Sequence, residues 1–375
     1  MNIAVNTRLL LDKRLEGIGW FSFETLKRVV MQHPEHTFYF IFDRPYHKKF
    51  VFSDNVIPVV TGPQARHPLL FYIWFEFSIP KILKKIKADI FISPDGYASL
   101  RSKVPNLLVM HDLNFEHYPD DLPWIITKYY TYFFPRFAKK AARIATVSEF
   151  SKKDIHECYG YPENKIDVIY NGVNENYHPI SDEEKMATKK KYTSGCDYFI
   201  YIGALLPRKN LKNLFLAYDL FRKQNKSTIK LLIVGARMWW TPEMEATINS
   251  LEYKNDIIFT GRLNSDELNN ALGAALALTY VSYFEGFGIP LLEAFRCDVP
   301  VITSDVTSLP EVAGDAALYT DPFNPISISE AMRQAASDEH LRESLISKAR
   351  ERRNFFSWDR TAELFWQSIQ KTVSK

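Results

Sequence analysis

The chain has 375 residues, of which 46% are hydrophobic and 24% are charged, and its formal net charge is +3. This length exceeds one typical core, so we expect two domains, and the small net charge gives no indication of nucleic-acid binding. The three cysteines, Cys158, Cys196 and Cys297, lack metal-ligand spacing, which favours reduced thiols in a cytoplasmic protein. The chain starts without the charged and apolar blocks of a signal peptide, and no apolar run approaches the length of a membrane span.

Residues 2–11 are predicted to form a first strand, followed by a glycine loop at residues 16–19 and a helix. A strand, a glycine loop and a helix in this order also occur in dinucleotide-binding proteins. Ser22 stands where the third glycine of that fingerprint belongs, so the match to a nicotinamide site is poor. A plain tight turn is the alternative interpretation of this loop.

Residues 69–77 are rich in aromatic and aliphatic side chains, and a cluster of lysines follows them at residues 81–87. The segment is too short to span a bilayer. It is either a surface in contact with an anionic membrane or a buried helix that ends in a solvated basic turn. Residues 129–137 have a similar aromatic character ahead of Lys139 and Lys140, and there a core helix is favoured over a second membrane patch.

Residues 88–93 and 106–110 are apolar runs typical of buried parallel strands. Polar residues follow each run, Asp95 in one case and His111 in the other. Ligands of open α/β sheets bind at the carboxyl ends of strands, so His111 is a candidate site residue. After a further strand at residues 144–147, either Ser148 or Ser151 is expected to cap the next helix, and residues 151–154 fit a capping box.

The second half of the chain opens with a strand at residues 198–202, and Arg208 and Lys209 follow it. Two cations at the carboxyl end of a strand are placed to neutralise a diphosphate, arginine through its planar fork and lysine as a point charge. A solvated loop is the alternative. Residues 230–234 and 257–260 repeat the pattern of a strand followed by a loop, which indicates a second Rossmann-like domain.

An apolar strand at residues 274–281 leads to Glu285 and then to a glycine loop that ends at Pro290. Proline is favoured at the start of a helix, so Glu293 is expected in the first turn of that helix. Amides at a helix N-terminus bind phosphate, and carboxylates bind sugar hydroxyls. Together these groups predict a nucleotide-sugar site, whereas a glycine turn beside a helix-dipole glutamate is the simpler alternative.

Residues 285–293, 299–302 and 309–316 resemble the retaining glycosyltransferases of family four, including their pair of glutamates eight positions apart. The resemblance covers nearly the whole chain, with small departures at Val281 and Asp298. It implies an α/β fold of the GT-B type, in which two Rossmann-like domains face one another. Residues 1–175 would form the acceptor-side domain, residues 176–356 the nucleotide-sugar-binding domain, and a last helix within residues 357–375 would cross back to the first.

The resemblance also assigns roles to residues of this chain. Catalytic roles fall to four residues, of which Glu285 and His111 would hold the donor sugar and Arg208 and Lys209 the diphosphate. Some relatives carry an arginine where this chain has Ala204, so Arg208 would supply that charge. Glu293 would bind the ribose. The other expected substrate-binding residues are Gly17, Gly19, Arg262, Leu263, Gly286, Phe287, Gly288, Ile289 and Leu291.

The expected function is retaining transfer of a hexose, such as mannose from GDP-mannose, to a glycan or lipid-linked acceptor in polysaccharide biosynthesis. The sequence contains no Asp-x-Asp motif for a divalent ion, so neither a metal nor a cofactor is expected. The predicted partners are the donor and the acceptor, with contact to the inner face of a membrane as an option and no nucleic acid. A nucleotide-sugar epimerase or hydrolase, or a non-catalytic nucleotide-sugar-binding scaffold, are the alternative functions.

Overall fold

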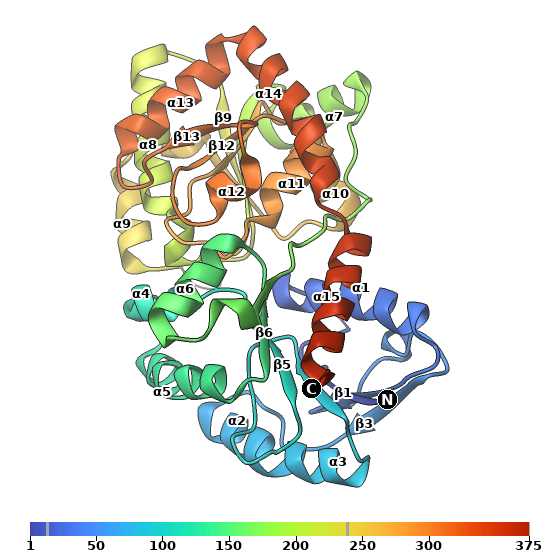
Figure 1. Ribbon diagram of the computed structural model, residues 1–375. Coiled ribbons are helices and arrows are strands. Elements are labelled where there is room, and N and C mark those ends of the chain that lie inside the picture. Colours follow the sequence, from blue (N-terminus) through green and yellow to red (C-terminus); the bar gives the residue numbers. More distant parts are fainter. Residues whose placement is uncertain (13–14, 238–239, 375) are drawn as a thin grey trace. The chain divides into compact units, whose positions relative to one another are not determined.

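The chain forms two compact units in the computed structural model, which describes residues 1–12, 15–237 and 240–374 (Figure 1). The first unit contains Met1–Gly172 and Ser357–Lys375, and the second contains Val173–Phe356. The chain leaves the first unit and returns to it at one point, because Gly172 lies against the backbone of Trp358 so closely that a side chain there would clash. The two units are described separately below.

The first unit is built on a parallel sheet in the order β3-β2-β1-β4-β5-β6-β7, counting the described residues. The order reverses between β1 and β4, which makes this pair the topological switch point where ligands of such sheets bind. The strands are β1 (Asn2–Asn6), β2 (Thr37–Phe42), β3 (Val56–Val60), β4 (Ile90–Ser93), β5 (Asn106–Val109), β6 (Arg143–Thr146) and β7 (Ile166–Val168).

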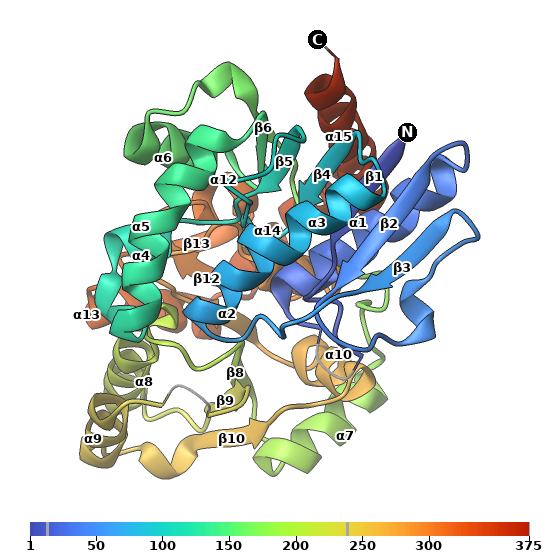
Figure 2. The ribbon, with the colours of Figure 1, turned by 90° about the horizontal axis from the view of Figure 1, so that it is seen from below.

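Helices cover both faces of this sheet. Phe21 of α1 packs edge-on against Trp358 and Phe365 of α15, with ring centroids 6.5 and 6.0 Å apart, so the C-terminal helix packs on the first unit as expected (Figure 1). Helices on the opposite face, α3 among them, bury a large aromatic core (Figure 2). The helices are α1 (Gly17–Gln32), α2 (Pro68–Ile73), α3 (Ile79–Lys85), α4 (Asn114–His117), α5 (Trp124–Lys140), α6 (Glu149–Tyr159) and α15 (Trp358–Val373).

Both aromatic segments belong largely to the core of the first unit. Residues 69–77 do not form one regular helix, because a π-helical turn at Trp74–Ser78 separates α2 from α3. Trp74 and Phe75 are fully buried in this turn. Tyr129, Phe134 and Phe137 of α5 are buried as well. In the part of the chain that the structure describes, every helix is too short or too polar to cross a membrane.

The second unit contains another parallel sheet, whose described strands follow the order β10-β9-β8-β11-β12-β13. Its switch point lies between β8 and β11. The strands are β8 (Tyr198–Ile202), β9 (Lys230–Val234), β10 (Ile257–Gly261), β11 (Ala277–Tyr280), β12 (Val301–Ser304) and β13 (Ala317–Thr320). The helices are α7 (Asp182–Thr193), α8 (Leu211–Asn225), α9 (Pro242–Ser250), α10 (Ser265–Gly273), α11 (Ile289–Arg296), α12 (Leu309–Ala313), α13 (Pro325–Ser337) and α14 (Glu339–Arg352).

The predictions for the end of β1 and for the cap of α6 were wrong in part. Strand β1 ends at Asn6 rather than at residue 11, because the chain turns there and the Leu10 amide donates to the carbonyl of Thr7 at 3.0 Å. The capping box expected at residues 151–154 is absent from these described residues. Ser148 caps α6 instead, since its hydroxyl accepts from the amide of Ser151 at 3.0 Å, and Ser151 therefore lies inside the helix.

Candidate functional site

The switch point of the second unit brings Arg208, Lys209 and Glu285 together. The two cations lie in a short 3₁₀ turn, Pro207–Lys209, that follows β8, and Glu285 lies in the loop after β11. Because β8 and β11 are parallel neighbours, both loops leave the same edge of the sheet. The amide of Tyr283 donates to the carbonyl of Arg208 at 3.0 Å, which joins the two loops.

The carboxylate of Glu285 accepts hydrogen bonds on both oxygens. Lys209 Nζ lies 2.5 Å from Oε1, and Arg208 Nη1 lies 2.7 Å from Oε2. The hydroxyl of Tyr280, the last residue of β11, also donates to Oε1 at 2.8 Å. Arg208 Nη1 donates to the carbonyl of Phe284 at 2.9 Å as well, so its guanidinium is oriented by the glutamate loop.

This cluster is buried and charged. Glu285 is 5% exposed and Lys209 is 8% exposed. Burial raises the pKa of Glu285, but the charges of Arg208 and Lys209 outweigh it and bring that pKa down to about 2. The carboxylate is therefore ionised at neutral pH. Two cations against one carboxylate leave these three side chains with one net positive charge, which favours an anionic ligand.

The glycine loop that follows Glu285 has one position that only glycine fits. Gly288 has a φ of +100°, and a Cβ there would lie 2.7 Å from Cδ2 of Leu309. Gly286 and Phe287 are buried beside it, and the Phe287 ring meets Phe356 edge-on with centroids 5.7 Å apart.

Helix α11 begins at Ile289, and Gly288 occupies its N-cap position. The amide of Leu291 donates to the carbonyl of Gly288 at 3.0 Å, so this amide is engaged within the turn. The sequence predicted Glu293 in the first turn of α11, but this residue starts the second turn. The difference arises because the helix starts at Ile289, one residue before Pro290, so Glu293 is its fifth residue.

Glu293 has an environment opposite to that of Glu285. It is half-buried, and the hydroxyl of Tyr177 hydrogen-bonds to it. Burial raises the pKa of Glu293 to about 7, although the bond from Tyr177 acts in the other direction. Glu293 thus titrates near neutral pH, while Glu285 stays ionised.

His111 lies two residues after the end of β5 in the first unit, at the edge where the sheet carries its polar residues. Its Nε2 donates to the carbonyl of Pro94 at 2.9 Å, and its ring meets Phe21 edge-on at 5.0 Å between centroids. Burial lowers the pKa of His111, so the ring is neutral at pH 7. Since a carbonyl only accepts, Nε2 carries the proton and the tautomer is fixed.

The remaining expected ligand residues lie at element ends. The sequence predicted a loop at Gly17 and Gly19. Both glycines lie instead in the first turn of α1, because the helix starts at Gly17. A Cβ on Gly19 would lie 3.0 Å from the carbonyl oxygen of Leu9, so glycine permits this close approach. Arg262 is exposed and Leu263 is half-buried, directly after β10.

Arg8, at the switch point of the first unit, was not predicted as a site residue. Arg8 Nε lies 2.6 Å from Oδ2 of Asp95, and Nδ2 of Asn6 donates to Oδ1 of the same carboxylate at 2.8 Å. The guanidinium carbon of Arg8 lies 4.5 Å from the ring centroid of Tyr97. Arg8 was hidden inside the overlong first strand, and an arginine just past an apolar strand is the signal that identifies it.

Comparisons with known proteins follow the division into two units. Residues 18–177 match the family model described as Glycosyltransferase Family 4, and residues 182–352 match the one described as Glycosyl transferases group 1. The chain is 31% identical over 278 residues to an O-antigen chain mannosyltransferase B of Escherichia coli, covering 74% of this chain and 73% of that protein. It is 28% identical to the O-antigen chain mannosyltransferase RfbU of Salmonella typhimurium, covering 74% of each.

Solved structures share the fold. The Anabaena protein Alr3699/HepE, in complex with UDP-glucose, superposes with a TM-score of 0.76 at 15% identity, over 99% of both chains. A glycosyltransferase from Rickettsia africae gives a TM-score of 0.73 at 18% identity, over 100% of this chain and 99% of that one. These matches confirm the α/β architecture of the GT-B type, with two Rossmann-like units.

Proposed function

Since this chain belongs to the glycosyltransferases of group 1 and family 4, we propose that it transfers mannose from GDP-mannose to a glycan or lipid-linked acceptor. Two of its relatives are O-antigen mannosyltransferases, which supports mannose as the sugar and polysaccharide biosynthesis as the process. The structure of Alr3699/HepE contains UDP-glucose, which supports a nucleotide sugar as the donor. The observation that carries the proposal is the buried cluster of two cations and Glu285 at the switch point of the second unit.

Arg208 and Lys209 would bind the donor diphosphate. When the bond between the sugar and the phosphate breaks, negative charge develops on the leaving diphosphate, and two fixed cations stabilise it without reorganisation. Arg208 Nη1 already bonds to Glu285 and to a carbonyl, so it is positioned before the donor arrives. The sequence lacks an Asp-x-Asp motif, and we expect these cations to act without a metal or other cofactor.

The two glutamates would bind hydroxyl groups. Glu285 is ionised and accepts bonds on both oxygens, and an ionised carboxylate has room for about four donors in all. A hydroxyl of the donor sugar would therefore join the present donors. Glu293, one turn into α11, would accept from the ribose, and Gly286, Phe287, Gly288 and Ile289 would line the path between them.

The proposed reaction retains the anomeric configuration. The acceptor oxygen forms its bond to the anomeric carbon on the face from which the diphosphate leaves. The acceptor proton passes to the departing phosphate oxygen, so charge and atoms balance without a side-chain nucleophile. His111, neutral and held by Pro94, would contact the donor sugar from the first unit. Gly17 and Gly19 would approach the diphosphate, and Arg262 and Leu263 would flank the base.

We also propose that the first unit, as the acceptor side, contacts the inner face of a membrane. Several large apolar side chains of its helices are exposed, among them Leu69 at 62%, Phe77 at 49%, Trp124 at 68% and Tyr132 at 53%. Basic residues of α3 and α5 accompany them, an arrangement suited to anionic lipid. Sedimentation with anionic vesicles, compared with neutral ones, tests this contact. Equal recovery with both would contradict it.

Donor binding tests the main proposal. We expect GDP-mannose to raise the melting temperature with chelator present, and we expect UDP-sugars to raise it less. Lys209→Ala should abolish the shift, whereas Lys212→Ala should preserve it. Lys212 is a matched control because it pairs with Glu243 on the surface, at 46% exposure, only three residues further along.

The outcomes separate the alternatives. A shift with a UDP-sugar alone would replace mannose as the donor and keep the site. Donor turnover at full rate without any acceptor would indicate a hydrolase. If no nucleotide sugar shifts the melting temperature, the assignment of Arg208, Lys209 and Glu285 to the donor is wrong.

A further inference from the structure

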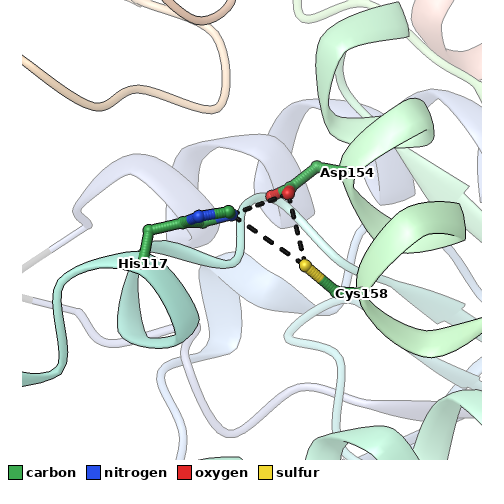
Figure 3. A group of neighbouring side chains, drawn as sticks. All are labelled: His117, Asp154 and Cys158. Atoms are coloured by element: carbon green, nitrogen blue, oxygen red, sulfur yellow. Dashed lines mark hydrogen bonds and ion pairs between the residues drawn. The ribbon is translucent and has the colours of Figure 1, made fainter.

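Three side chains of the first unit, His117, Asp154 and Cys158, converge on one point (Figure 3). His117 is the last residue of α4, while Asp154 and Cys158 lie one turn apart on the same face of α6. His117 Nε2 is 2.7 Å from Oδ1 of Asp154, and Cys158 Sγ is 3.5 Å from the same oxygen. The nitrogen and the sulfur are 4.0 Å apart.

These separations resemble those between the ligands of a metal ion. A four-coordinate zinc ion has bonds of about 2.0–2.3 Å to nitrogen, oxygen and sulfur, so its ligand atoms lie about 3.3–3.6 Å apart. Of the three distances between the ligand atoms, 3.5 Å lies within this range, 2.7 Å lies below it and 4.0 Å lies above it. Small rotations of the three side chains would place their ligand atoms at three corners of a tetrahedron around the ion.

A second observation points to a missing ligand. Asp154 is 6% exposed, and its other oxygen, Oδ2, is buried without a hydrogen-bond partner among the described residues. A buried oxygen left without a hydrogen-bond partner is destabilising, because it has lost its contact with water and gained none in return. Figure 3 shows the contacts of His117 and Cys158 meeting at one oxygen of this carboxylate, Oδ1, and a cation held there by both carboxylate oxygens would also satisfy Oδ2.

The surrounding charge also favours a cation. Glu116 and Glu157 lie close enough to act on Cys158, and Asp112 acts on Asp154 in the same way. His117 and Cys158 are exposed, so an ion can reach the site from solvent. Cysteine spacing gives no sign of this site, because the partners of Cys158 are a histidine and an aspartate and not the other cysteines.

We propose that His117, Asp154 and Cys158 bind a divalent transition-metal ion, with zinc as the best match and water in the fourth position. Imidazole and thiolate favour zinc over magnesium or calcium, which prefer oxygen ligands alone. Binding replaces the protons on Cys158 Sγ and His117 Nε2 and releases them to solvent, so the affinity rises with pH. The ion would tie α4 to α6 and hold the segment that carries His111, three residues before α4 begins.

Cobalt(II) titration of the full chain, first stripped with chelator, tests this site. One equivalent should bind with a thiolate-to-cobalt charge-transfer band in the near ultraviolet, and zinc should displace it and raise the melting temperature. Cys158→Ser should abolish the band and weaken zinc binding about tenfold or more. His117→Ala should weaken it similarly. Cys196→Ser is the matched control, because Cys196 is a half-exposed thiol of the second unit.

Two outcomes would overturn the proposal. One is the absence of a thiolate band in the unsubstituted protein at an equivalent of cobalt. The other is a band that survives Cys158→Ser but disappears with Cys196→Ser, which would identify adventitious binding elsewhere. Cys158 is exposed, so its replacement by serine should leave the fold intact, and circular dichroism of the variant checks this. Donor binding by the second unit is a separate measurement and does not decide the result.

Discussion

The switch points of the two units share a plan but differ in charge. In each unit an arginine follows the strand that comes first along the chain, β1 or β8, and pairs with a carboxylate that follows the strand across the switch point, β4 or β11. Arg8 pairs with Asp95 at 2.6 Å, and Arg208 pairs with Glu285 at 2.7 Å. In the second unit Lys209 adds another cation to the same carboxylate.

Because of Lys209, the cluster of the second unit can attract an anion, whereas the Arg8–Asp95 pair of the first unit is electrically balanced. Arg8 and Asp95 neutralise one another among aromatic rings, with Tyr97 4.5 Å and Phe71 5.1 Å from the guanidinium carbon. Such a pair fixes the loops after β1 and β4 but has no charge left for a ligand. The cluster of the second unit keeps one positive charge, and it lies where nucleotides bind in sheets of this order. We therefore expect the same topology to serve structure in the first unit and donor binding in the second.

Replacing Glu285 should have the largest effect. In Glu285→Gln the shape is kept, but the amide cannot balance both cations or accept on two oxygens, so we expect transfer to fall about 100-fold or more. Glu285→Ala should in addition lower the free energy of unfolding by about 3–5 kcal/mol, because it removes the buried carboxylate that balances the charges of Arg208 and Lys209. Initial rates and chemical denaturation measure the two effects. Unchanged turnover in Glu285→Gln would contradict the role of this carboxylate.

Breaking the balanced pair of the first unit should affect stability rather than donor binding. Arg8→Met leaves Asp95, which is 8% exposed, as an unpaired buried charge, and we expect a loss of about 3 kcal/mol in the free energy of unfolding. Arg8→Met combined with Asp95→Asn should recover part of this loss. The affinity for GDP-mannose should change by less than about twofold in the folded double variant. A collapse of donor affinity there would show that both switch points bind the donor.

The interaction between Lys209 and Glu285 has no counterpart among the described residues at the switch point of the first unit, and its energy can be measured directly. A double-mutant cycle of Lys209→Met and Glu285→Gln should give a coupling energy of about 1–3 kcal/mol, measured by chemical denaturation. The single change Lys209→Met should also reduce donor affinity, because it removes the charge that distinguishes this switch point. Additive effects on stability would mean that the 2.5 Å contact contributes little.

Features that depend on neighbouring residues in the sequence were predicted better than contacts between segments far apart in the chain. Strands such as Tyr198–Ile202 and Lys230–Val234 were predicted at their observed bounds, since continuous apolar runs between polar residues identify buried strands locally. The grouping of Arg208 and Lys209 with Glu285 was expected only as a shared location. Their direct pairing depends on the parallel alignment of β8 and β11, which no local pattern contains.

The contacts that were missed join segments far apart in the chain. The bond between Tyr177 and Glu293 and the convergence of His117 with Asp154 and Cys158 both arise from tertiary packing. Helix α11 starts at Ile289, one residue before the predicted start at Pro290, and Glu293 therefore lies in the second turn. The preference of proline for the start of a helix does not fix the first residue to within one position. Electrostatic differences between the two glutamates follow from such contacts, so the spacing of the motif alone does not reveal them.

The smallest predicted effect concerns Glu293, which has a neighbouring tyrosine but titrates near pH 7 because of burial. Its pKa rises from an ordinary 4.5 to about 7 on folding, so the folded state binds this proton more tightly than the unfolded state. Its contribution to stability is complete below pH 4.5 and is lost as the pH rises through 7. For this half-buried group we expect about 1–2 kcal/mol across that window, measured as the difference in unfolding free energy between the unsubstituted protein and Glu293→Gln.

Glu285 should show the reverse dependence. Its pKa falls from 4.5 to about 2 on folding, so its contribution is present above 4.5 and is lost as the pH falls toward 2. Glu339→Gln, at an exposed glutamate of the second unit, is the control substitution. Tyr177→Phe should move the midpoint for Glu293 upward, because the tyrosine bond lowers its pKa. A pH-independent difference for Glu293→Gln would mean that its carboxyl group is solvated, and the contrast between the two glutamates would then reduce to the cations that Glu285 alone contacts.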